Sequence, residues 1–350
     1  MKREFIEVPG NALLELLYRN SVFKLGSTVW LSRKKLAGLG FQYIAVEALV
    51  REHVIAEDPT VRGGEVYNTI YRDRLFSIFY PPGDHLADAS LTPKPDGRKV
   101  LVSWMDLQDM LPNPPLPVFV IDLSLKFIHT EEEATKLKVQ IAMSLSVIRE
   151  YLWDAHLALT GVESGSTEWI SDMVGYNKMT VTQNKPSELL WGLDADKVII
   201  LRPDAPQPLS RDDVLEADGF LIGGIVDKIP RPGLSRMLDN LVPWGMPRRL
   251  ELRGSVIGVP ERINRIIEIL LKSRYMYNGD IEKAIVSTMT RKDVVSRAYV
   301  EIARRAARRG SVSWDLYREL KAWLPIRKKD FLEAAKKAKV EIVGVEPIED

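Results

Sequence analysis

Short apolar runs alternate with helical patterns between residues 117 and 271. The run PVFVIDLSL at 117–125 is almost continuously apolar, as expected for a strand covered on both faces. Residues 131–153 then carry apolar side chains at every third or fourth position, which predicts a helix. Because strands that alternate with helices form parallel sheets covered by helices, we predict an α/β fold for the middle of the chain.

Further elements continue this alternation. HLALTG at 156–161, KVIILRP at 197–203 and DGFLIGGIVDK at 218–228 have the apolar character of buried strands. Ser210-Arg211-Asp212-Asp213 resembles a capping box that opens a short helix, with Asp in place of the usual Glu or Gln. Pro260 lies at a predicted first helical position, ahead of a one-sided apolar pattern that ends at Leu271.

Breaker residues and charge divide the chain into three predicted domains. Proline clusters at 81–95 and 112–117 indicate segments that link domains, because proline cannot continue a helix or a central strand. We therefore expect residues 1–95 to form an N-terminal α/β domain. The middle domain covers 96–275, and a basic, all-helical domain covers 276–350. Although the net charge is only +1, the residues from Leu271 onward hold 18 Lys and Arg against 12 Asp and Glu. Such a segment favours a polyanionic partner, although solvated helix faces have the same composition.

Composition and missing motifs exclude several classes of function. The absence of cysteine excludes disulfides, thiolate nucleophiles and cysteine-ligated metal sites. The four histidines show no ligand spacing, so no metal is expected. No Walker loop, GxSxG or HExxH motif occurs, and AGLGFQ lacks the third glycine of a dinucleotide site. Without a membrane-length apolar run or a secretory signal, a cytoplasmic protein with no membrane contact is expected.

Three segments late in the middle domain join strand ends to glycine or proline. They are ILRPD at 200–204, IGGIVDK at 222–228 and LRGSVIGVPERIN at 252–264. Glycine inside a strand marks close approach of another backbone or a ligand, and ligands of open α/β sheets bind beyond the carboxyl ends of strands. Each segment alone also fits a bulge, a turn or a packing contact. Together they predict a binding site.

These segments, with QIAMSLSVIREYLWDAHLALTG at 140–161 and PVFVIDLSL, resemble the archaeal tRNA position-9 N1-methyltransferases of the SPOUT class. The resemblance covers about residues 115–275. It implies a trefoil-knotted parallel sheet covered by helices, S-adenosylmethionine as cofactor, and tRNA as substrate. It also implies a monomer whose N-terminal and C-terminal domains bind tRNA.

The same resemblance assigns candidate site residues. Asp227 matches the proposed catalytic aspartate. Cofactor contacts are implied at Leu201, Arg202, Pro203, Gly223, Gly224, Val226, Leu250, Leu252, Gly254, Gly258, Arg262, Ile263 and Asn264. Positions near the target nucleotide are Asp122, Gln140 and Arg149. From their charge and position, and apart from the resemblance, the basic residues expected to contact tRNA are Lys228, Arg231, Arg236, Arg304, Arg305, Arg308 and Arg309, with a solvated helix face as the alternative for the last four.

One aspartate serves methylation of either purine. Guanine N1 carries a proton that a base must remove, whereas adenine N1 offers a lone pair and becomes cationic on methylation. Asp227 therefore does not choose between the two, and adenosine is favoured because the motifs resemble crenarchaeal enzymes that modify adenosine 9. The open alternatives are a SPOUT enzyme with another RNA target and a non-catalytic RNA-binding protein on a knotted fold.

Overall fold

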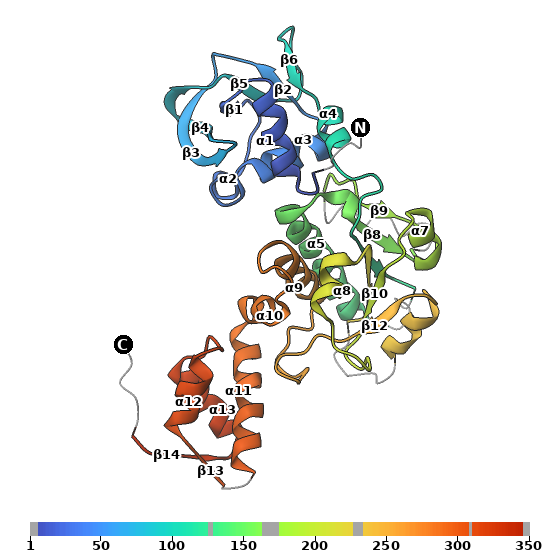
Figure 1. Ribbon diagram of the computed structural model, residues 1–350, viewed down its shortest axis with the longest axis vertical. Coiled ribbons are helices and arrows are strands. Elements are labelled where there is room, and N and C mark those ends of the chain that lie inside the picture. The colour runs from blue at the N-terminus through green and yellow to red at the C-terminus, as the bar shows by residue number, and fades with distance from the viewer. Residues whose placement is uncertain (1–5, 125–128, 163–174, 227–233, 308–309, 346–350) are drawn as a thin grey trace. The chain divides into compact units, whose positions relative to one another are not determined.

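The computed structural model describes residues 6–124, 129–162, 175–226, 234–307 and 310–345 (Figure 1). The chain divides into two compact units, Met1–Asp196 and Lys197–Asp350. Both contain helices and parallel strand pairs, so a mixed α/β protein is confirmed. None of the described helices is long and apolar enough to cross a membrane.

The first unit begins with a six-stranded mixed sheet. In chain order its strands are β1 (Lys24–Ser27), β2 (Val54–Glu57), β3 (Arg62–Tyr71), β4 (Arg74–Leu86), β5 (Ala89–Thr92) and β6 (Val100–Val102). They lie in the order β3-β4-β1-β5-β2-β6, in which β1 pairs parallel with β4 and β5. Strand β6 pairs with β2, so this sheet continues beyond residue 95. The domain limits at 95 and 275 stay a prediction.

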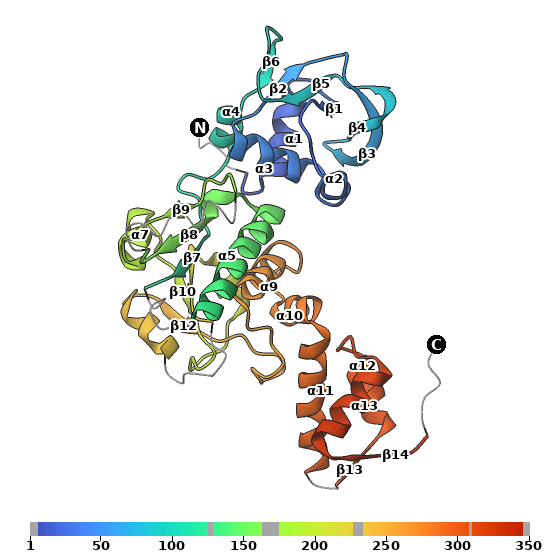
Figure 2. The same ribbon diagram turned by 180° about the vertical axis from the view of Figure 1, so that it is seen from behind.

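Four helices accompany this sheet: α1 (Pro9–Arg19), α2 (Arg33–Leu39), α3 (Phe41–Arg51) and α4 (Trp104–Met110). Helices α1 and α3 lie side by side next to the sheet, as both views show (Figures 1 and 2). Their apolar faces share one core with the strands, in which Leu13, Leu17, Leu49 and Phe76 are each at most 1% exposed.

The rest of the first unit has the predicted alternation of strands and helices. Its elements are β7 (Val118–Asp122), α5 (Glu131–Tyr151), the 3-10 turn η2 (Asp154–His156), β8 (Leu157–Thr160), β9 (Thr180–Val181) and α7 (Pro186–Gly192). Strand β8 pairs parallel with both β7 and β9. The strand predicted at 117–125 and the helix predicted at 131–153 are both confirmed. Thr130 and Glu133 form a capping box that fixes the start of α5.

One buried amide joins three helices of this unit. The Gln42 Oε1 atom accepts a hydrogen bond from the Gly10 N–H at 2.8 Å. Its Nε2 atom donates to the carbonyl oxygens of Leu152 and Arg149, at 2.8 and 3.1 Å. Helices α1 and α3 are thereby fixed to the end of α5, because breaking these bonds would leave buried polar groups unsatisfied.

The second unit begins with three parallel strands. Its first elements are β10 (Val198–Leu201), α8 (Arg211–Glu216), β11 (Gly219–Gly223), the 3-10 helix η3 (Leu234–Asn240), β12 (Met246–Arg248) and α9 (Ile263–Tyr275). Strand β10 lies between β11 and β12 and is parallel to both. The predicted capping box at Ser210 and Asp213 is present at the start of α8.

Two boundaries predicted in this unit were wrong. Strand β11 ends at Gly223, so Gly224 lies beyond the strand rather than within it. Its partner β10 ends at Leu201, opposite Ile222, which leaves the following residues without a ladder partner in β10. Helix α9 begins at Ile263 and not at Pro260, because turns around Gly258 precede it.

The end of the chain is mainly helical, as predicted. It contains α10 (Ile281–Thr288), α11 (Arg291–Ala306), β13 (Ser311–Ser313), α12 (Trp314–Lys321), α13 (Lys328–Ala338) and β14 (Glu341–Val343). The expectation of helices alone was wrong, because β13 and β14 form a short parallel pair. Helices α11, α12 and α13 surround a separate core in which Ala298, Ile302 and Phe331 are completely buried.

Candidate functional site

The three glycine- and proline-bearing segments lie at one edge of the second unit. Leu201, the last residue of β10, pairs with Ile222 of β11 and with Arg248 of β12. Because β10, β11 and β12 are parallel, the segments that follow them all begin at the same edge of the sheet, the edge formed by the carboxyl ends of the strands. The Arg202 N–H also donates to the Arg248 carbonyl oxygen at 3.1 Å. The structure thus brings together the strand ends that the sequence singled out.

The side chain of Arg202 is occupied by an ion-pair network. It is 8% exposed and contacts Asp204 at 2.6 Å and Asp239 at 3.0 Å. Burial alone would lower the pKa of Arg202, but hydrogen bonds and charge from these two carboxylates outweigh it and raise the pKa. Arg236, an expected tRNA contact, is exposed and also pairs with Asp204, at 2.6 Å. The Arg202 side chain is therefore already bound within the protein by two carboxylates.

The loop after β11 begins at a crowded glycine. A Cβ atom on Gly223 would lie 3.1 Å from Ile225 Cδ1 and 3.2 Å from Leu238 Cδ1. Gly224 is buried, and Val226 is the last described residue of this segment. The proposed catalytic Asp227 and the expected tRNA contacts Lys228 and Arg231 lie outside the described residues.

The third loop, residues 249–262, is held by its own turns. Leu250 and Leu252 are buried, and Leu252 bridges to Ser255 across Arg253 and Gly254. Both residues within this bridge have positive φ, +48° at Arg253 and +72° at Gly254. A Cβ on Gly254 would meet no atom within 4 Å, so this glycine serves the turn and not a close contact.

The loop ends at the start of α9. Arg262 is the exposed N-cap residue, and Ile263 and Asn264 are 2% exposed. The buried Asn264 Oδ1 atom has no hydrogen-bond partner among the described residues. Because a buried polar atom is normally paired, this oxygen can accept a hydrogen bond from a ligand donor.

The residues expected near the target nucleotide lie in the first unit. Asp122, at the end of β7, is 2% exposed and accepts hydrogen bonds from Thr160, at 3.1 Å, and from Ser124. Burial raises the pKa of Asp122, although these hydrogen bonds oppose the rise. Gln140 is half-buried on α5. The Arg149 guanidinium binds the fully buried carboxylate of Asp154 through two hydrogen bonds of 2.6 and 2.7 Å.

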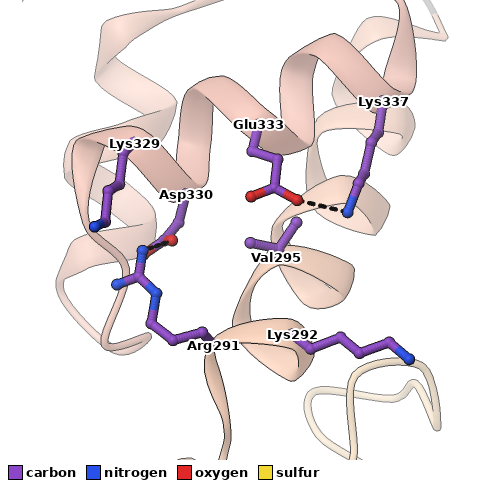
Figure 3. Close-up of a pocket in the computed structure, with 7 residues that line it drawn as sticks. All are labelled: Arg291, Lys292, Val295, Lys329, Asp330, Glu333 and Lys337. Carbon is purple, nitrogen blue, oxygen red and sulfur yellow. Dashed lines mark hydrogen bonds and ion pairs between the residues drawn. The ribbon is translucent and has the colours of Figure 1, made fainter.

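The tail places some of its predicted tRNA contacts on the surface. Arg304 and Arg305 have side chains 52% and 59% exposed, and Arg305 binds both oxygens of Glu319. Arg308 and Arg309 lie outside the described residues. Sequence reasoning missed another basic region, a pocket between α11 and α13 with a volume of about 460 Å³. Figure 3 shows the side chains that line it.

Charges within this pocket are partly paired. Arg291 binds Asp330, and Lys337 binds Glu333 at 2.7 Å (Figure 3). Lys292 and Lys329 are exposed, and within the described residues neither has an ion pair. The sequence does contain a signal for this region, because two adjacent basic residues stand at the start of α11 and again at the start of α13. Counting charges over the whole tail does not reveal these two positions.

A buried arginine lies beside the third loop and was not predicted. Arg297 on α11 is 0% exposed, and its Nη2 atom binds Glu301 at 2.5 Å. Its Nε and Nη1 atoms have no partner among the described residues. The Trp323 ring lies 5.6 Å from this guanidinium and 4.3 Å from that of Arg253 in the loop. The sequence signal that could have indicated its burial is the position of this arginine among the buried apolar residues of α11.

Comparison with known proteins identifies the family. Residues 107–238 match the family model described as tRNA (guanine(9)-N(1))-methyltransferase TRM10/TRM10A. The chain is 30% identical to the tRNA (adenine(9)-N1)-methyltransferase of Sulfolobus acidocaldarius over 260 residues, covering 73% of this chain and 78% of that protein. It is also 30% identical to the tRNA (guanine(9)-/adenine(9)-N1)-methyltransferase of Thermococcus kodakarensis over 254 residues, covering 69% of this chain and 66% of that protein.

Solved structures agree on the fold. The crystal structure of Sulfolobus acidocaldarius Trm10 in complex with S-adenosylhomocysteine matches with a TM-score of 0.66 and 23% identity, covering 94% of this chain and 98% of that chain. A dual-specific Trm10 from Thermococcus kodakaraensis matches with a TM-score of 0.55 and 21% identity, covering 77% of this chain and 96% of that chain. With the sequence identity to the Sulfolobus enzyme, this leads to one conclusion: the chain belongs to the Trm10 family of tRNA position-9 N1-methyltransferases.

Proposed function

We propose that this protein transfers a methyl group from S-adenosylmethionine to N1 of the purine at position 9 of tRNA, with adenosine favoured over guanosine. The observation that carries the proposal is the 30% identity to the Sulfolobus enzyme over most of both chains. Specificity for adenosine rests on that relative's name, and the dual activity named for the Thermococcus relative keeps guanosine 9 as the alternative.

The strand ends of the second unit fit the cofactor. The glycines after β11 and in the third loop permit close approach of its adenosine and methionine parts. The buried Asn264 Oδ1, which has no hydrogen-bond partner among the described residues, suits an amino group, which S-adenosylmethionine carries on both its adenine and its methionine portion. We assign the cofactor to the backbone of residues 201–203, to Gly223, Gly224 and Val226, and to the loop from Leu250 to Asn264. When bound, it supplies an electrophilic methyl group on a sulfonium.

The proposal includes a trefoil knot around this site. Its support is the resemblance to the SPOUT class, and the strand order β12-β10-β11, which unknotted α/β sheets also have, is compatible with it. Members of the SPOUT class, which this chain resembles, bind the cofactor within such a knot.

Asp227 is the proposed catalytic residue. For guanosine its carboxylate accepts the N1 proton, and for adenosine it stabilises the cation formed on methylation. Asp122, Gln140 and Arg149 are proposed to shape the pocket for the target base. The neighbouring Lys228 and Arg231, with Arg236, are proposed to hold the tRNA backbone next to the reacting base.

Both ends of the chain are proposed to bind tRNA in the cytoplasm, with the protein acting as a monomer. In the tail, the exposed Lys292 and Lys329 join Arg304, Arg305, Arg308 and Arg309 as candidate phosphate contacts. Unstacking the base at position 9 costs a few kcal/mol, which phosphate contacts on both sides of the target offset.

Mass spectrometry of nucleosides tests the reaction. Wild-type protein is incubated with S-adenosylmethionine and transcripts that carry either A or G at position 9. We expect 1-methyladenosine at position 9, and less or no 1-methylguanosine. Methylation at a different nucleotide would assign another RNA target. Binding of tRNA without methylation of any transcript would favour a non-catalytic RNA-binding protein.

The Asp227→Asn variant tests the catalytic assignment. We expect a lower methylation rate with nearly unchanged affinity for S-adenosylhomocysteine, measured by calorimetry. An equal loss of cofactor binding would mean that Asp227 supports the structure of the loop and does not take part in the reaction.

A further inference from the structure

The most exposed large apolar side chain among the described residues belongs to Trp30, at 87%. It lies between β1 and α2 in the first unit. Its neighbour Leu31 is buried, with 2% of its surface exposed. The two successive side chains therefore point in opposite directions, that of Leu31 into the core and that of Trp30 into solvent. A single exposed apolar residue is ordinary on a protein surface, and the surroundings of Trp30 decide its meaning.

The backbone that carries Trp30 is fixed on both sides. Before it, the Val29 N–H donates to Ser27 Oγ at 3.2 Å. After it, the Leu31 N–H donates to the Tyr80 hydroxyl at 2.6 Å, and the Ser32 N–H donates to the Tyr43 hydroxyl at 3.3 Å. The indole is therefore presented outward from an anchored segment.

Three consecutive cations follow the exposed ring. Arg33, Lys34 and Lys35 begin α2, and all three are exposed. Arg33 donates to the Pro81 carbonyl oxygen at 2.9 Å, and the Lys35 ammonium lies 5.6 Å from the Tyr43 ring. None of the three forms an ion pair with a described acidic residue. The segment from Trp30 to Lys35 thus combines an aromatic face with uncompensated positive charge.

We infer that Trp30 stacks on an exposed base of the tRNA while Arg33 and Lys34 contact the adjoining phosphates. Aromatic side chains beside basic residues are the usual means of holding unpaired nucleotides, because every base has a stacking face and every linkage a negative charge. The inference rests on the proposed tRNA substrate and gives the N-terminal domain a defined role in binding it. Charge complementarity favours RNA over a protein partner.

The test compares tRNA affinity among full-length variants, using anisotropy of an end-labelled transcript. Trp30→Ala should weaken binding by about 5- to 150-fold, the range for loss of one stacked base, whereas Trp30→Phe should stay close to wild type. The matched control is Trp191→Ala, because Trp191 is 77% exposed but has Glu188 and Asp194 nearby in the sequence. That control should bind tRNA like wild type.

A second measurement tests the cations. Lys34→Gln should lower the slope of log affinity against log salt by about one unit or slightly less, as expected for one lost phosphate contact. Lys185→Gln, at the exposed lysine that precedes α7, is the control for loss of one charge and should leave the slope as in wild type. Unchanged slope in Lys34→Gln would remove the phosphate contact from the inference.

Activity measurements separate this inference from the proposed function. In Trp30→Ala, KM for tRNA should rise, while kcat and S-adenosylhomocysteine affinity should stay as in wild type. Wild-type affinity in Trp30→Ala, or an equal loss in Trp191→Ala, would overturn the inference even if position 9 is methylated. If wild type methylates another nucleotide, the proposed function fails, and the affinity data still report whether Trp30 binds RNA.

Discussion

Gly258 lies directly against the backbone of Arg297, with space for a hydrogen atom and none for a methyl group. A Cβ built on Gly258 would lie 2.7 Å from Arg297 Cβ and 3.0 Å from Arg297 Cα. Gly258 also has a φ of +82°, which side-chain-bearing residues rarely adopt. The third loop of the candidate site is thus packed on α11 of the basic tail.

We expect Gly258→Ala to lower the free energy of unfolding by about 2–4 kcal/mol. About 1–2 kcal/mol comes from the left-handed backbone, and the remainder from overpacking against Arg297. Chemical denaturation measures the loss. Gly254→Ala is the matched control, because Gly254 has a φ of +72° but open space around its Cα. A cost as large in Gly254→Ala would show that strain alone, without the Arg297 contact, explains both.

Glu301 is expected to stabilise the buried Arg297. Burial lowers the pKa of Arg297, and the charge of Glu301 opposes this effect. Glu301→Gln removes that compensation and should cost about 1–3 kcal/mol. The double variant Arg297→Met/Glu301→Gln should cost less than the sum of the two single variants, because no buried charge then remains unpaired. Additive costs in a denaturation cycle would contradict this coupling.

The Asp122→Asn variant is expected to gain stability relative to wild type as the pH rises. Burial raises the pKa of Asp122 above its ordinary 3.8, so the folded protein keeps this proton to a higher pH than the unfolded chain does. Wild type therefore loses stability from about pH 3.8 up through the raised pKa, whereas asparagine does not titrate. The difference in unfolding free energy between variant and wild type, measured across this range, should increase and then level off.

Asp58→Asn is the control for that titration and should behave oppositely. Burial opposes ionisation of Asp58, but hydrogen bonds from Thr60 and Ser90 and the charge of Arg98 outweigh it and lower the pKa. The stabilisation from this carboxylate is lost as the pH falls below 3.8. Above that pH, the unfolding free energy of wild type should therefore be larger than that of the variant. Parallel pH profiles for the two variants would refute the assignment.

Arg149→Gln is expected to act on stability. It leaves the fully buried Asp154 carboxylate without its guanidinium partner, although the Lys178 N–H still donates to it at 2.8 Å. We expect a loss of about 2–4 kcal/mol in unfolding free energy, with partial recovery in Arg149→Lys. A large rise in KM for tRNA at unchanged melting temperature would instead identify Arg149 as a direct substrate contact.

Local sequence signals predicted the elements that local forces determine. The strand at Val118–Asp122 follows from its apolar run, and the helix at Glu131–Tyr151 from its periodicity and its Thr130 cap. Boundaries set by distant partners were missed. The end of β11 depends on where β10 stops, and the start of α9 depends on turns packed near Arg297. The strands β13 and β14 have three residues each, too few for a periodic pattern.

The candidate site shows the same division. Glycines at strand ends indicated where the loops would meet, and the parallel register at Leu201 brings them to one edge. The sequence could not indicate that the Arg202 side chain is held by Asp204 and Asp239, because both contacts depend on tertiary packing. The burial of Arg297 escaped prediction for the same reason.

The Gln42 amide has a consequence for substrate selection. Tilting the N-terminal sheet and its helices against the end of α5 would break three hydrogen bonds, two of them buried, so these bonds oppose any change in the span between Trp30 and α5. An RNA that touches both places must match this span with its own folded dimensions. Under the proposed binding of tRNA at both places, discrimination among tRNAs at this end of the protein would depend on the three-dimensional shape of the folded RNA.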